Sequence, residues 1–413
     1  MKVLHINTTD SGGAAWCAMR ISKALSSQGV ECRFLIAEGS PQENVIVAKR
    51  DEEFWYSNYF LGKVKHLLMR TPFFWDKEKM DKVLKEKNTQ LEKPLFIHGP
   101  FSYYKNIINH PLFEWADIIH LHWVPEFIDY PSFFRKVNKP IVWTLHDKYP
   151  VLGIMHYCSE FFPVPDSLKS IDRFCMKIKR RGIKKTKRLS LVAISEQMFD
   201  ICIESEVLRG LPVSLIHNGV DINVFHQYGK ETCREELGLP KNAIVFLFSA
   251  YYIFDPNKGL DRVVYALNKL KEVDKILVCI GNNYPLEKPP KADFPLKMVG
   301  VQNDCLRIAK YYSAADFFVQ GSYEETFAQT PLEAMACGTP VISTPCSGAK
   351  DLIRDFNGVI CNAYNSDAIE EGIRKAVNTQ YDSDAICQHV VENYQYSKIA
   401  QKYKELYESI LKG

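Results

Sequence analysis

The stretch SYEETFAQTPLEAMACGTP at residues 322–340 decides the fold of this chain. It follows a short apolar strand predicted at 316–319. Within it, Pro331 suits the first turn of a helix and Gly338 suits the stop before the next strand. The small residues of AMACGTP indicate that this helix packs closely on its neighbouring strands. Strand, helix and strand in this order predict a right-handed βαβ unit in a parallel sheet.

The same alternation of apolar runs and helical stretches extends over nearly all 413 residues. Strands are predicted at 2–6, 31–37, 118–122, 141–145 and 191–194, and again at 244–249, 275–280, 297–299, 316–319 and 341–343. Because the pattern restarts after about residue 222, we predict an α/β protein with two doubly wound Rossmann-like domains, at 1–222 and 223–395. The C-terminal helix, 396–413, is amphipathic and is expected to pack back on the first domain.

Composition and charge exclude several classes of protein. With 46% hydrophobic and 24% charged residues, the chain is neither disordered nor of low complexity. The formal net charge is +3, from 52 Lys and Arg against 49 Asp and Glu, so no nucleic-acid partner is expected. No run approaches the ~18 apolar residues of a membrane-spanning helix, and the N-terminus turns polar too early for a signal peptide. The 12 cysteines lack any CxxC, which favours reduced thiols and a cytoplasmic location.

Two glutamates of the deciding stretch carry the first chemical prediction. Glu325 precedes the predicted helix, and Glu333 lies in its first half. A carboxylate accepts two hydrogen bonds and therefore suits the vicinal hydroxyls of a ribose or hexose. A solvated helix face would also explain two glutamates, but it would not require the small residues beside them.

Two further turns suit a phosphate. Lys258 precedes Gly259 after the strand at 244–249, and Ser347-Gly348 opens a helix after the strand at 341–343. A lysine point charge and the N–H groups of a helix start are typical of phosphate binding. Each would be an ordinary turn by itself. Together with the glutamates, they place sugar-binding and phosphate-binding groups at neighbouring strand ends of one sheet.

In the first half, DSGGAA at residues 10–15 joins the first strand to a helix. Gly12 and Gly13 allow backbone to approach a ligand there. The motif is not GxGxxG, so a dinucleotide cofactor is not expected.

Histidines end two other strands of the first half. His120 and His122 end one strand, while His146 and Asp147 follow the next. Ligands of open parallel sheets bind outside these strand ends, which makes the histidines candidate site residues. Zinc held by His120, His122, His146 and Cys158 is an alternative, although the spacing matches no standard zinc motif.

Two segments do not fit the alternation. Residues 54–75 mix aromatics with basic residues, and 177–188 (KIKRRGIKKTKR) carry eight basic residues in twelve. Each is interpreted as a solvated helix or loop, or as a surface that docks on anionic lipid headgroups, where a basic residue contributes roughly 1 kcal/mol. RNA binding is less favoured because no RNA-binding motif accompanies either segment.

The combined motifs resemble the GT-B glycosyltransferases, specifically the large retaining family 4. The strongest part is 321–353, where two glutamates separated by seven residues precede AMACGTPV; HLHW at 120–123, TLHD at 144–147 and NGVD at 218–221 support it. The resemblance implies two Rossmann-like domains facing each other across a cleft. It also implies transfer of a sugar from a nucleotide-diphosphate sugar to a glycan or lipid-linked acceptor with retention of anomeric configuration.

A narrower resemblance concerns the bacterial setting. TLHD followed by Gly153 and His156-Tyr157 is similar to a bacterial subgroup of surface-polysaccharide enzymes. This implies capsule, O-antigen or lipopolysaccharide biosynthesis, and an enzyme that is cytoplasmic or peripheral on the inner face of the cytoplasmic membrane.

Carried onto this sequence, the resemblance also implies roles for residues of the second half. Glu333 would bind the ribose, and Glu325 would bind the donor sugar. Lys258 and the turn at Ser347 and Gly348 would hold the diphosphate. No DxD-type pair is evident beside these residues, so neither a metal nor any other cofactor is expected.

In the first half, Gly12 and Gly13 would close over the diphosphate, and His122 would contact the donor sugar near the reacting carbon. His146, with Asp147, would lie toward the acceptor. The implied catalytic residues are His122, Glu325 and Lys258. The implied donor-binding residues are Gly12, Gly13, Lys258, Glu325, Phe327, Ala328, Gln329, Thr330, Glu333, Ser347 and Gly348.

The sequence departs from the resemblance at two places near Lys258. Many relatives carry an arginine just after the strand that precedes Lys258, whereas this chain reads SAYY at 249–252, including Tyr251. Asn257 also stands where close relatives often have arginine. One positively charged side chain that would face the diphosphate is therefore missing, or another residue supplies it. Two alternatives stay open: a GT-B sugar-nucleotide epimerase or hydrolase, and a non-catalytic sugar-nucleotide-binding protein.

Overall fold

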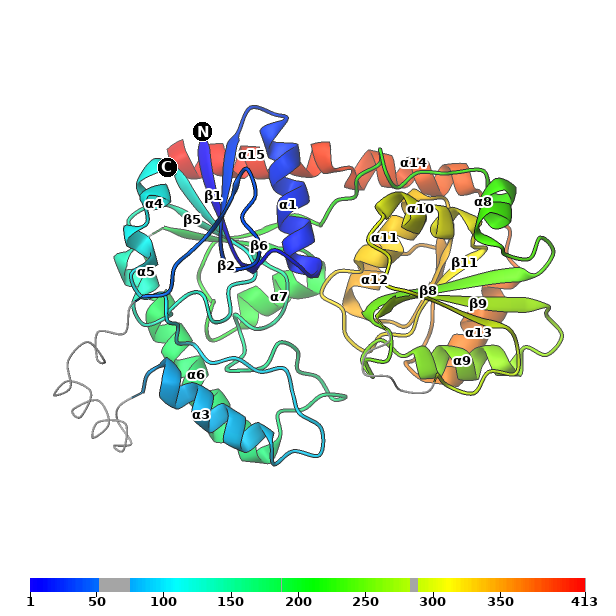
Figure 1. The fold of residues 1–413 in the computed structure, drawn as a ribbon, viewed down its shortest axis with the longest axis horizontal. Helices are drawn as coiled ribbons and strands as arrows, with labels where there is room; N and C mark the ends of the chain where they lie inside the picture. Colours follow the sequence, from blue (N-terminus) through cyan, green and yellow to red (C-terminus); the bar gives the residue numbers. More distant parts are fainter. Residues whose placement is uncertain (52–74, 187, 283–288, 413) are drawn as a thin grey trace. The chain divides into compact units, whose positions relative to one another are not determined.

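A computed structural model describes residues 1–51, 75–186, 188–282 and 289–412 (Figure 1). The chain divides into two compact units. Unit 1 comprises Met1–Ile194, Met198–Ile216 and Ala400–Gly413, and unit 2 comprises Ser195–Gln197 and His217–Ile399. The aromatic-rich segment 54–75 singled out in the sequence lies outside the described residues, except for Trp75.

Unit 1 contains a parallel sheet of seven strands in the order β3-β2-β1-β4-β5-β6-β7. Its strands are β1 (Lys2–Thr9), β2 (Glu31–Glu38), β3 (Val45–Val47), β4 (Ile118–Leu121), β5 (Ile141–Leu145), β6 (Leu189–Ala193) and β7 (Val213–Leu215). Its helices are α1 (Gly13–Ser26), α3 (Lys77–Asn88), α4 (Pro111–Trp115), α5 (Phe133–Lys136), α6 (Asp166–Ile183), most of α7 (Glu196–Glu204) and most of α15 (Tyr396–Lys412), with a short 3₁₀ turn at Ile107–Asn109.

Unit 2 contains a parallel sheet of six strands in the order β10-β9-β8-β11-β12-β13. Its strands are β8 (Ile244–Tyr252), β9 (Lys275–Asn282), β10 (Leu296–Gly300), β11 (Phe317–Gln320), β12 (Val341–Ser343) and β13 (Gly358–Ile360). Its helices are α8 (Lys230–Leu237), α9 (Leu260–Lys269), α10 (Cys305–Ala314), α11 (Gln329–Ala336), α12 (Ser347–Leu352), α13 (Ser366–Val377) and α14 (Ser383–Tyr394). Helices cover both faces of this sheet, with α9 and α13 together on one face (Figure 1).

All ten strands predicted from the sequence are present, and both sheets are parallel as expected. The sequence missed β3, β7 and β13, which have three residues each and lie at a sheet edge. So short a run of apolar residues does not produce a recognisable period. All 12 cysteines are unpaired in the structure.

Each sheet has one point where the strand order reverses direction. In unit 1 it lies between β1 and β4, and in unit 2 between β8 and β11. In open parallel sheets, loops that leave neighbouring strands at such a point turn to opposite faces, and ligands typically bind there, outside the carboxyl ends of the strands. The motifs singled out in the sequence follow these strands or their immediate neighbours.

Helix α15 packs on unit 1 through two buried tyrosines. Tyr403 bonds through its hydroxyl to Thr144 Oγ1 at 2.9 Å, and Tyr407 to His120 Nδ1 at 2.7 Å. Alternation along β1 directs Leu4 and Ile6 into the large apolar core on one face of the sheet, and His5 to the other face. His5 and its register partner His120 on β4 therefore share their face of the sheet with α15.

The basic run 177–188 is not one continuous exposed surface. Lys179 has no exposed surface, and its Nζ donates to the carbonyl oxygens of Tyr149 (2.6 Å) and Leu152 (2.9 Å). Burial lowers the pKa of Lys179 to about 7. The basic residues of the run that are described and exposed are Lys177, Arg180, Arg181, Lys184, Lys185 and Arg188. No helix among the described residues has the length and apolar character to cross a bilayer.

Candidate functional site

Three loops meet at the carboxyl edge of the sheet in unit 2. They follow β8, β11 and β12, which are adjacent in the sheet. The first carries Lys258, the second carries Glu325, and the third leads into α12 at Ser347. The structure thus brings together the predicted sugar-binding and phosphate-binding loops.

Lys258 and Glu325 form an ion pair across two of these loops. Lys258 Nζ donates to Glu325 Oε1 at 2.7 Å, and Ser322 Oγ donates to the same oxygen at 2.9 Å. The side chains are 29% and 17% exposed, so the pair is shielded but reachable from solvent. Burial lowers the pKa of Lys258, but the charge and hydrogen bond of Glu325 outweigh it, and the net effect raises this pKa. The lysine is therefore held in its charged form.

Asn257 fastens the Lys258 loop to the Glu325 loop. Its Nδ2 donates to the carbonyl oxygen of Glu324, and Glu324 N–H donates to its Oδ1, both at 2.9 Å. In the sequence, Asn257 occupies a position where arginine is common in the family that the chain resembles. In the structure it is buried and binds protein backbone.

Arg262, on the first turn of α9, is a residue that the sequence did not single out. Its Nη2 donates to the carbonyl oxygens of Gly321 at 2.7 Å and Pro256 at 3.2 Å, and its guanidinium lies 3.6 Å from the ring centre of Tyr323. It ties the Lys258 loop to the end of β11. No local pattern distinguishes it from an arginine on a solvated helix face.

The start of α12 closely approaches the Glu325 loop. Ser347 Oγ and Gly348 N–H both donate to the carbonyl oxygen of Glu325, the latter at 3.3 Å. A Cβ on Gly348 would lie 2.5 Å from Ala328 N and 2.7 Å from Phe327 Cα. Only glycine fits at this position without displacing backbone.

Glu333 is buried rather than solvated. It lies on α11 with 7% of its surface exposed, and the hydroxyl of Tyr312 donates to its Oε2 at 3.4 Å. On the same helix, Gln329 Nε2 donates to the carbonyl oxygen of Gly219 at 3.1 Å. A solvated helix face is therefore not the explanation for Glu333.

In unit 1, the glycine turn follows β1. Gly12 has φ +90°, and Gly13 begins α1. A Cβ on either glycine would have no atom of the described residues within 4 Å outside its chain neighbours and its own helix. Asp10 holds this turn to the next loop by accepting from Ser40 N–H at 2.8 Å. The turn thus has open space beside its glycines.

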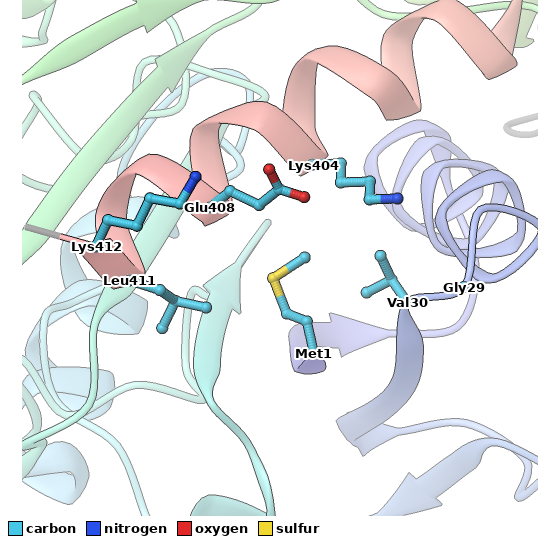
Figure 2. Close-up of a pocket in the computed structure, with 7 residues that line it drawn as sticks. All are labelled: Met1, Gly29, Val30, Lys404, Glu408, Leu411 and Lys412. Atoms are coloured by element: carbon cyan, nitrogen blue, oxygen red, sulfur yellow. The ribbon is translucent and has the colours of Figure 1, made fainter.

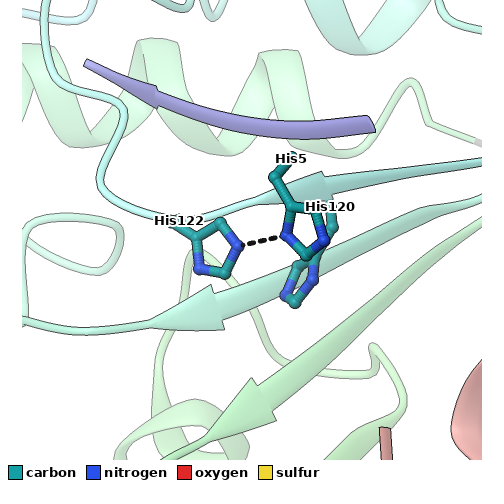
Figure 3. Close-up of side chains that lie close together, drawn as sticks. All are labelled: His5, His120 and His122. Carbon is teal, nitrogen blue, oxygen red and sulfur yellow. Dashed lines mark hydrogen bonds between the residues drawn. The ribbon is translucent and has the colours of Figure 1, made fainter. Parts of the chain in front are cut away.

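A row of histidines begins inside β1 and ends at the carboxyl edge of the same sheet. His122 bonds through Nε2 to His5 Nδ1 at 2.9 Å (Figure 3). Its Nδ1 bonds to His146 Nε2 at 3.1 Å. His122 is 2% exposed, whereas His146 is half-buried. Because His122 is buried, His146 is the histidine of this pair that offers surface to a ligand.

Asp147 belongs to a neighbouring cluster. Its Oδ2 accepts from Trp123 Nε1 at 2.8 Å and bonds to His156 Nδ1 at 2.6 Å, and His156 Nε2 bonds to His98 Nδ1 at 2.7 Å. Burial raises the pKa of Asp147, but His156 and the N–H donors outweigh burial and lower it overall. Asp147 is therefore a charged carboxylate at the same edge of the sheet.

Two family profiles account for most of the chain. Residues 229–395 match the family described as Glycosyl transferases group 1, and residues 11–224 match the family described as Glycosyltransferase Family 4. The second match spans more than half of the 413 residues. The chain belongs to glycosyltransferase family 4.

Curated relatives match parts of this glycosyltransferase. It is 28% identical over 194 residues to the D-inositol 3-phosphate glycosyltransferase of Streptomyces bingchenggensis, covering 42% of each chain. It is 24% identical over 220 residues to the lipopolysaccharide 1,2-N-acetylglucosaminetransferase of Salmonella typhimurium, covering 48% of this chain and 57% of the relative. The chain thus spans about half the length of the curated relatives it matches.

Solved structures match the glycosyltransferase over its full length. Sucrose-phosphate synthase from Thermosynechococcus elongatus has a TM-score of 0.71 at 17% identity, covering 99% of this chain and 98% of that chain. Anabaena Alr3699/HepE in complex with UDP-glucose has a TM-score of 0.68 at 17% identity, covering 99% and 100%. The predicted GT-B fold with two Rossmann-like domains is confirmed.

Two further observations concern a pocket in unit 1 and the alternative set of zinc ligands. A pocket of about 390 Å³ is lined by Met1, Val30, Leu411 and their neighbours, at the amino ends of β1 and β2 and so at the opposite edge of the sheet (Figure 2). The alternative zinc set with Cys158 is not assembled: in the described part of the chain, the group of three or more potential ligands close enough to share an ion is His5, His120 and His122.

Proposed function

We propose that this glycosyltransferase moves a sugar from a nucleotide-diphosphate sugar to a glycan or lipid-linked acceptor, with retention of the anomeric configuration. The observation that carries the proposal is the Lys258–Glu325 pair at the strand-order reversal of unit 2, with buried Glu333 on the helix that follows the same loop. A cation, a carboxylate for sugar hydroxyls and a second carboxylate for a ribose are what such a donor requires.

On the donor side, Lys258 is proposed to face the diphosphate, together with backbone N–H groups at Ser347 and Gly348. Glu325 is proposed to bind hydroxyls of the sugar, and Glu333 those of the ribose. The remaining donor contacts are proposed for Gly12, Gly13, Phe327, Ala328, Gln329 and Thr330. His122 is proposed to lie near the reacting carbon, and His146 and Asp147 toward the acceptor.

The chemical difficulty of the transfer is negative charge that develops on the leaving diphosphate while the sugar becomes oxocarbenium-like. Fixed positive groups aimed at that charge lower the barrier more than they would in water. Lys258, held in its charged form by Glu325, is proposed to supply this stabilisation without a divalent metal. Attack on the face that the leaving group departs from accounts for retention.

The biological setting is proposed from relatives. It is bacterial surface-polysaccharide biosynthesis on the cytoplasmic side of the membrane, and the lipopolysaccharide 1,2-N-acetylglucosaminetransferase among the relatives supports the polysaccharide part of this proposal.

The test starts with thermal stabilisation of the full chain by a panel of UDP-, GDP- and ADP-sugars. A ligand at 100 times its Kd adds about 2.7 kcal/mol to the stability of the folded state. The stabilising donor is then supplied with glycan and lipid-linked acceptors, with and without EDTA, and the anomeric configuration of the product is read by NMR. Transfer with retention that persists in EDTA supports the proposal.

Three outcomes oppose it. Epimerised or hydrolysed donor without any acceptor favours the alternative enzyme class. Donor binding without transfer across the acceptor panel favours a binding protein. Loss of activity in EDTA, restored by Mg²⁺, removes the metal-independent mechanism.

A further inference from the structure

Three imidazoles in unit 1 form one hydrogen-bonded chain. His5 comes from the middle of β1, His122 directly follows β4, and His146 directly follows β5. His5 Nδ1 and His122 Nε2 are 2.9 Å apart (Figure 3). His122 Nδ1 and His146 Nε2 are 3.1 Å apart. The chain runs from the buried interior of the sheet to its carboxyl edge.

Because all three imidazole rings are neutral, the number of protons that they hold together is fixed. Burial lowers the pKa of His5 to about 3 and that of His146 to about 4, and it lowers the pKa of His122 well below its ordinary value. A neutral imidazole has one N–H and one bare nitrogen. Three rings therefore hold three protons. Two of these lie in the two nitrogen–nitrogen contacts, and the third lies at one end.

The environment of the two ends decides where the third proton lies. His5 Nε2 is buried and has no hydrogen-bond partner among the residues that the structure describes. A buried N–H without an acceptor is rarer in proteins than an unsatisfied acceptor. The other end, His146 Nδ1, belongs to a half-buried ring, and the described residues offer it no recorded partner. The proton is accommodated there, where a ligand or water reaches it.

We propose that His5 and His122 hold His146 in the tautomer with its proton on Nδ1, so that His146 donates a hydrogen bond to an oxygen atom of a bound substrate. His5 Nδ1–H donates to His122 Nε2, and His122 Nδ1–H donates to His146 Nε2. His5 and His122 are thus positioning residues. The identity of the ligand rests on the proposed function, and the tautomer does not.

A metal ion explains the cluster less well. Ring nitrogens of His5, His120 and His122 lie within 4.8 Å of one another. However, His120 already bonds through both nitrogens, to Thr144 Oγ1 at 2.8 Å and to the Tyr407 hydroxyl at 2.7 Å. A metal would break these bonds, and within the described residues the group contains no carboxylate to balance its charge.

The direct test is ¹⁵N NMR of the full chain labelled at histidine, with no substrate added. A ring nitrogen that carries a proton resonates far from one with a bare lone pair, and His146→Asn assigns the signals of His146. We expect wild-type His146 to be protonated at Nδ1. Protonation at Nε2 overturns the proposal, and so does stoichiometric Zn²⁺ binding that shifts the signals of His5 and His122.

Variants of His5 test whether His5, through His122, sets the tautomer of His146. His5→Phe removes the donor and should leave His146 in a mixture of tautomers. His5→Asn keeps an N–H near the place of Nδ1 and should restore the single tautomer, while exposed His226→Asn should change nothing at His146. If the tautomer of His146 is unchanged in His5→Phe, His5 does not set it, and the proposal is refuted. If His5→Phe does not fold, the wild-type spectrum still decides which end carries the proton.

Kinetics identify the oxygen that accepts the bond. His5→Phe should raise the KM of one substrate about 10-fold with a smaller change in kcat, and His5→Asn should recover it. A rise in donor KM assigns the oxygen to the sugar nucleotide, and a rise in acceptor KM assigns it to the acceptor. If the tautomer shifts but neither KM moves, the substrate contact is refuted. An inactive wild-type protein with the expected tautomer refutes the proposed function alone.

Discussion

Lys258 Nζ lies 2.7 Å from Glu325 Oε1, so the proposed phosphate-binding and sugar-binding side chains are paired with each other. Each fixes the other in place. Asn257 and Arg262 bind backbone on the same two loops and hold the pair in register. Removing one partner therefore changes both the charge of the site and the position of the other partner.

Lys258→Met should lower kcat by about 10²- to 10³-fold, because it removes a fixed positive group from the leaving diphosphate. Glu325→Gln keeps an acceptor for Lys258 but removes the charge, so it should weaken sugar selection with a smaller effect on nucleotide binding. Steady-state kinetics with the donor found in the panel measure both. Exposed Lys271→Met is the control for loss of one positive charge. Unchanged turnover in Lys258→Met contradicts the placement of the diphosphate.

Glu333→Ala should weaken nucleotide binding by about 10- to 100-fold, which corresponds to about 1.4–2.7 kcal/mol. The buried carboxylate of Glu333 has the acceptor oxygens that ribose hydroxyls require. Calorimetry with the nucleoside diphosphate alone measures the effect without chemistry. Glu235→Ala, on the exposed face of α8, is the matched control. Equal affinity in wild type and Glu333→Ala would remove Glu333 from the site.

Two glycine substitutions separate packing from ligand contact. Gly348→Ala forces a Cβ to within 2.5 Å of Ala328 N, so it should destabilise unit 2 by about 1–3 kcal/mol. Gly13→Ala places its Cβ in open space and should leave stability unchanged, while it weakens donor binding if that space receives the diphosphate. Thermal unfolding and calorimetry report the two effects. A stable Gly13→Ala with full donor affinity would remove Gly13 from the donor site.

Much of the architecture follows from sequence, because apolar strands alternating with helices leave few arrangements other than parallel sheets. The loops of Lys258, Glu325 and Ser347 were predictable for the same reason: strand ends of one sheet lie together. Arg262 and His5 were not predictable, because their roles depend on contacts with residues 59 and 117 positions away. Their local sequence reads as an ordinary helix and an ordinary strand.

Binding to anionic lipid stays a prediction. The structure limits the described basic residues of 177–188 that can take part to the exposed ones, because Lys179 is buried. Lys184→Ser with Lys185→Ser, both exposed, should reduce sedimentation with phosphatidylglycerol vesicles, since each basic residue contributes roughly 1 kcal/mol. Lys241→Ser with Lys271→Ser, exposed on unit 2, removes the same charge elsewhere. Equal sedimentation of the two double variants would refute lipid docking through the basic run.

The buried histidines predict that unit 1 loses stability in mild acid. His5 is neutral in the folded protein, with its pKa lowered from 6.5 to about 3 by burial. The unfolded chain therefore binds more protons between these values, so this contribution to stability is present above pH 6.5 and is lost as pH falls below it. From pH 7.5 to 5.5, one such histidine should lower the free energy of unfolding by about 1.4 kcal/mol.

Urea unfolding followed by tryptophan fluorescence isolates this effect, because all six tryptophans lie between residues 16 and 143, in unit 1. His5→Phe should lose about 1.4 kcal/mol less than wild type over the same pH interval, whatever its stability at pH 7.5. Exposed His226→Asn, in unit 2, should lose as much as wild type. If the free energy of unfolding of His5→Phe depends on pH as that of wild type does, His5 is protonated in the folded protein. The three imidazoles would then hold more than three protons, which contradicts the proposal for His146.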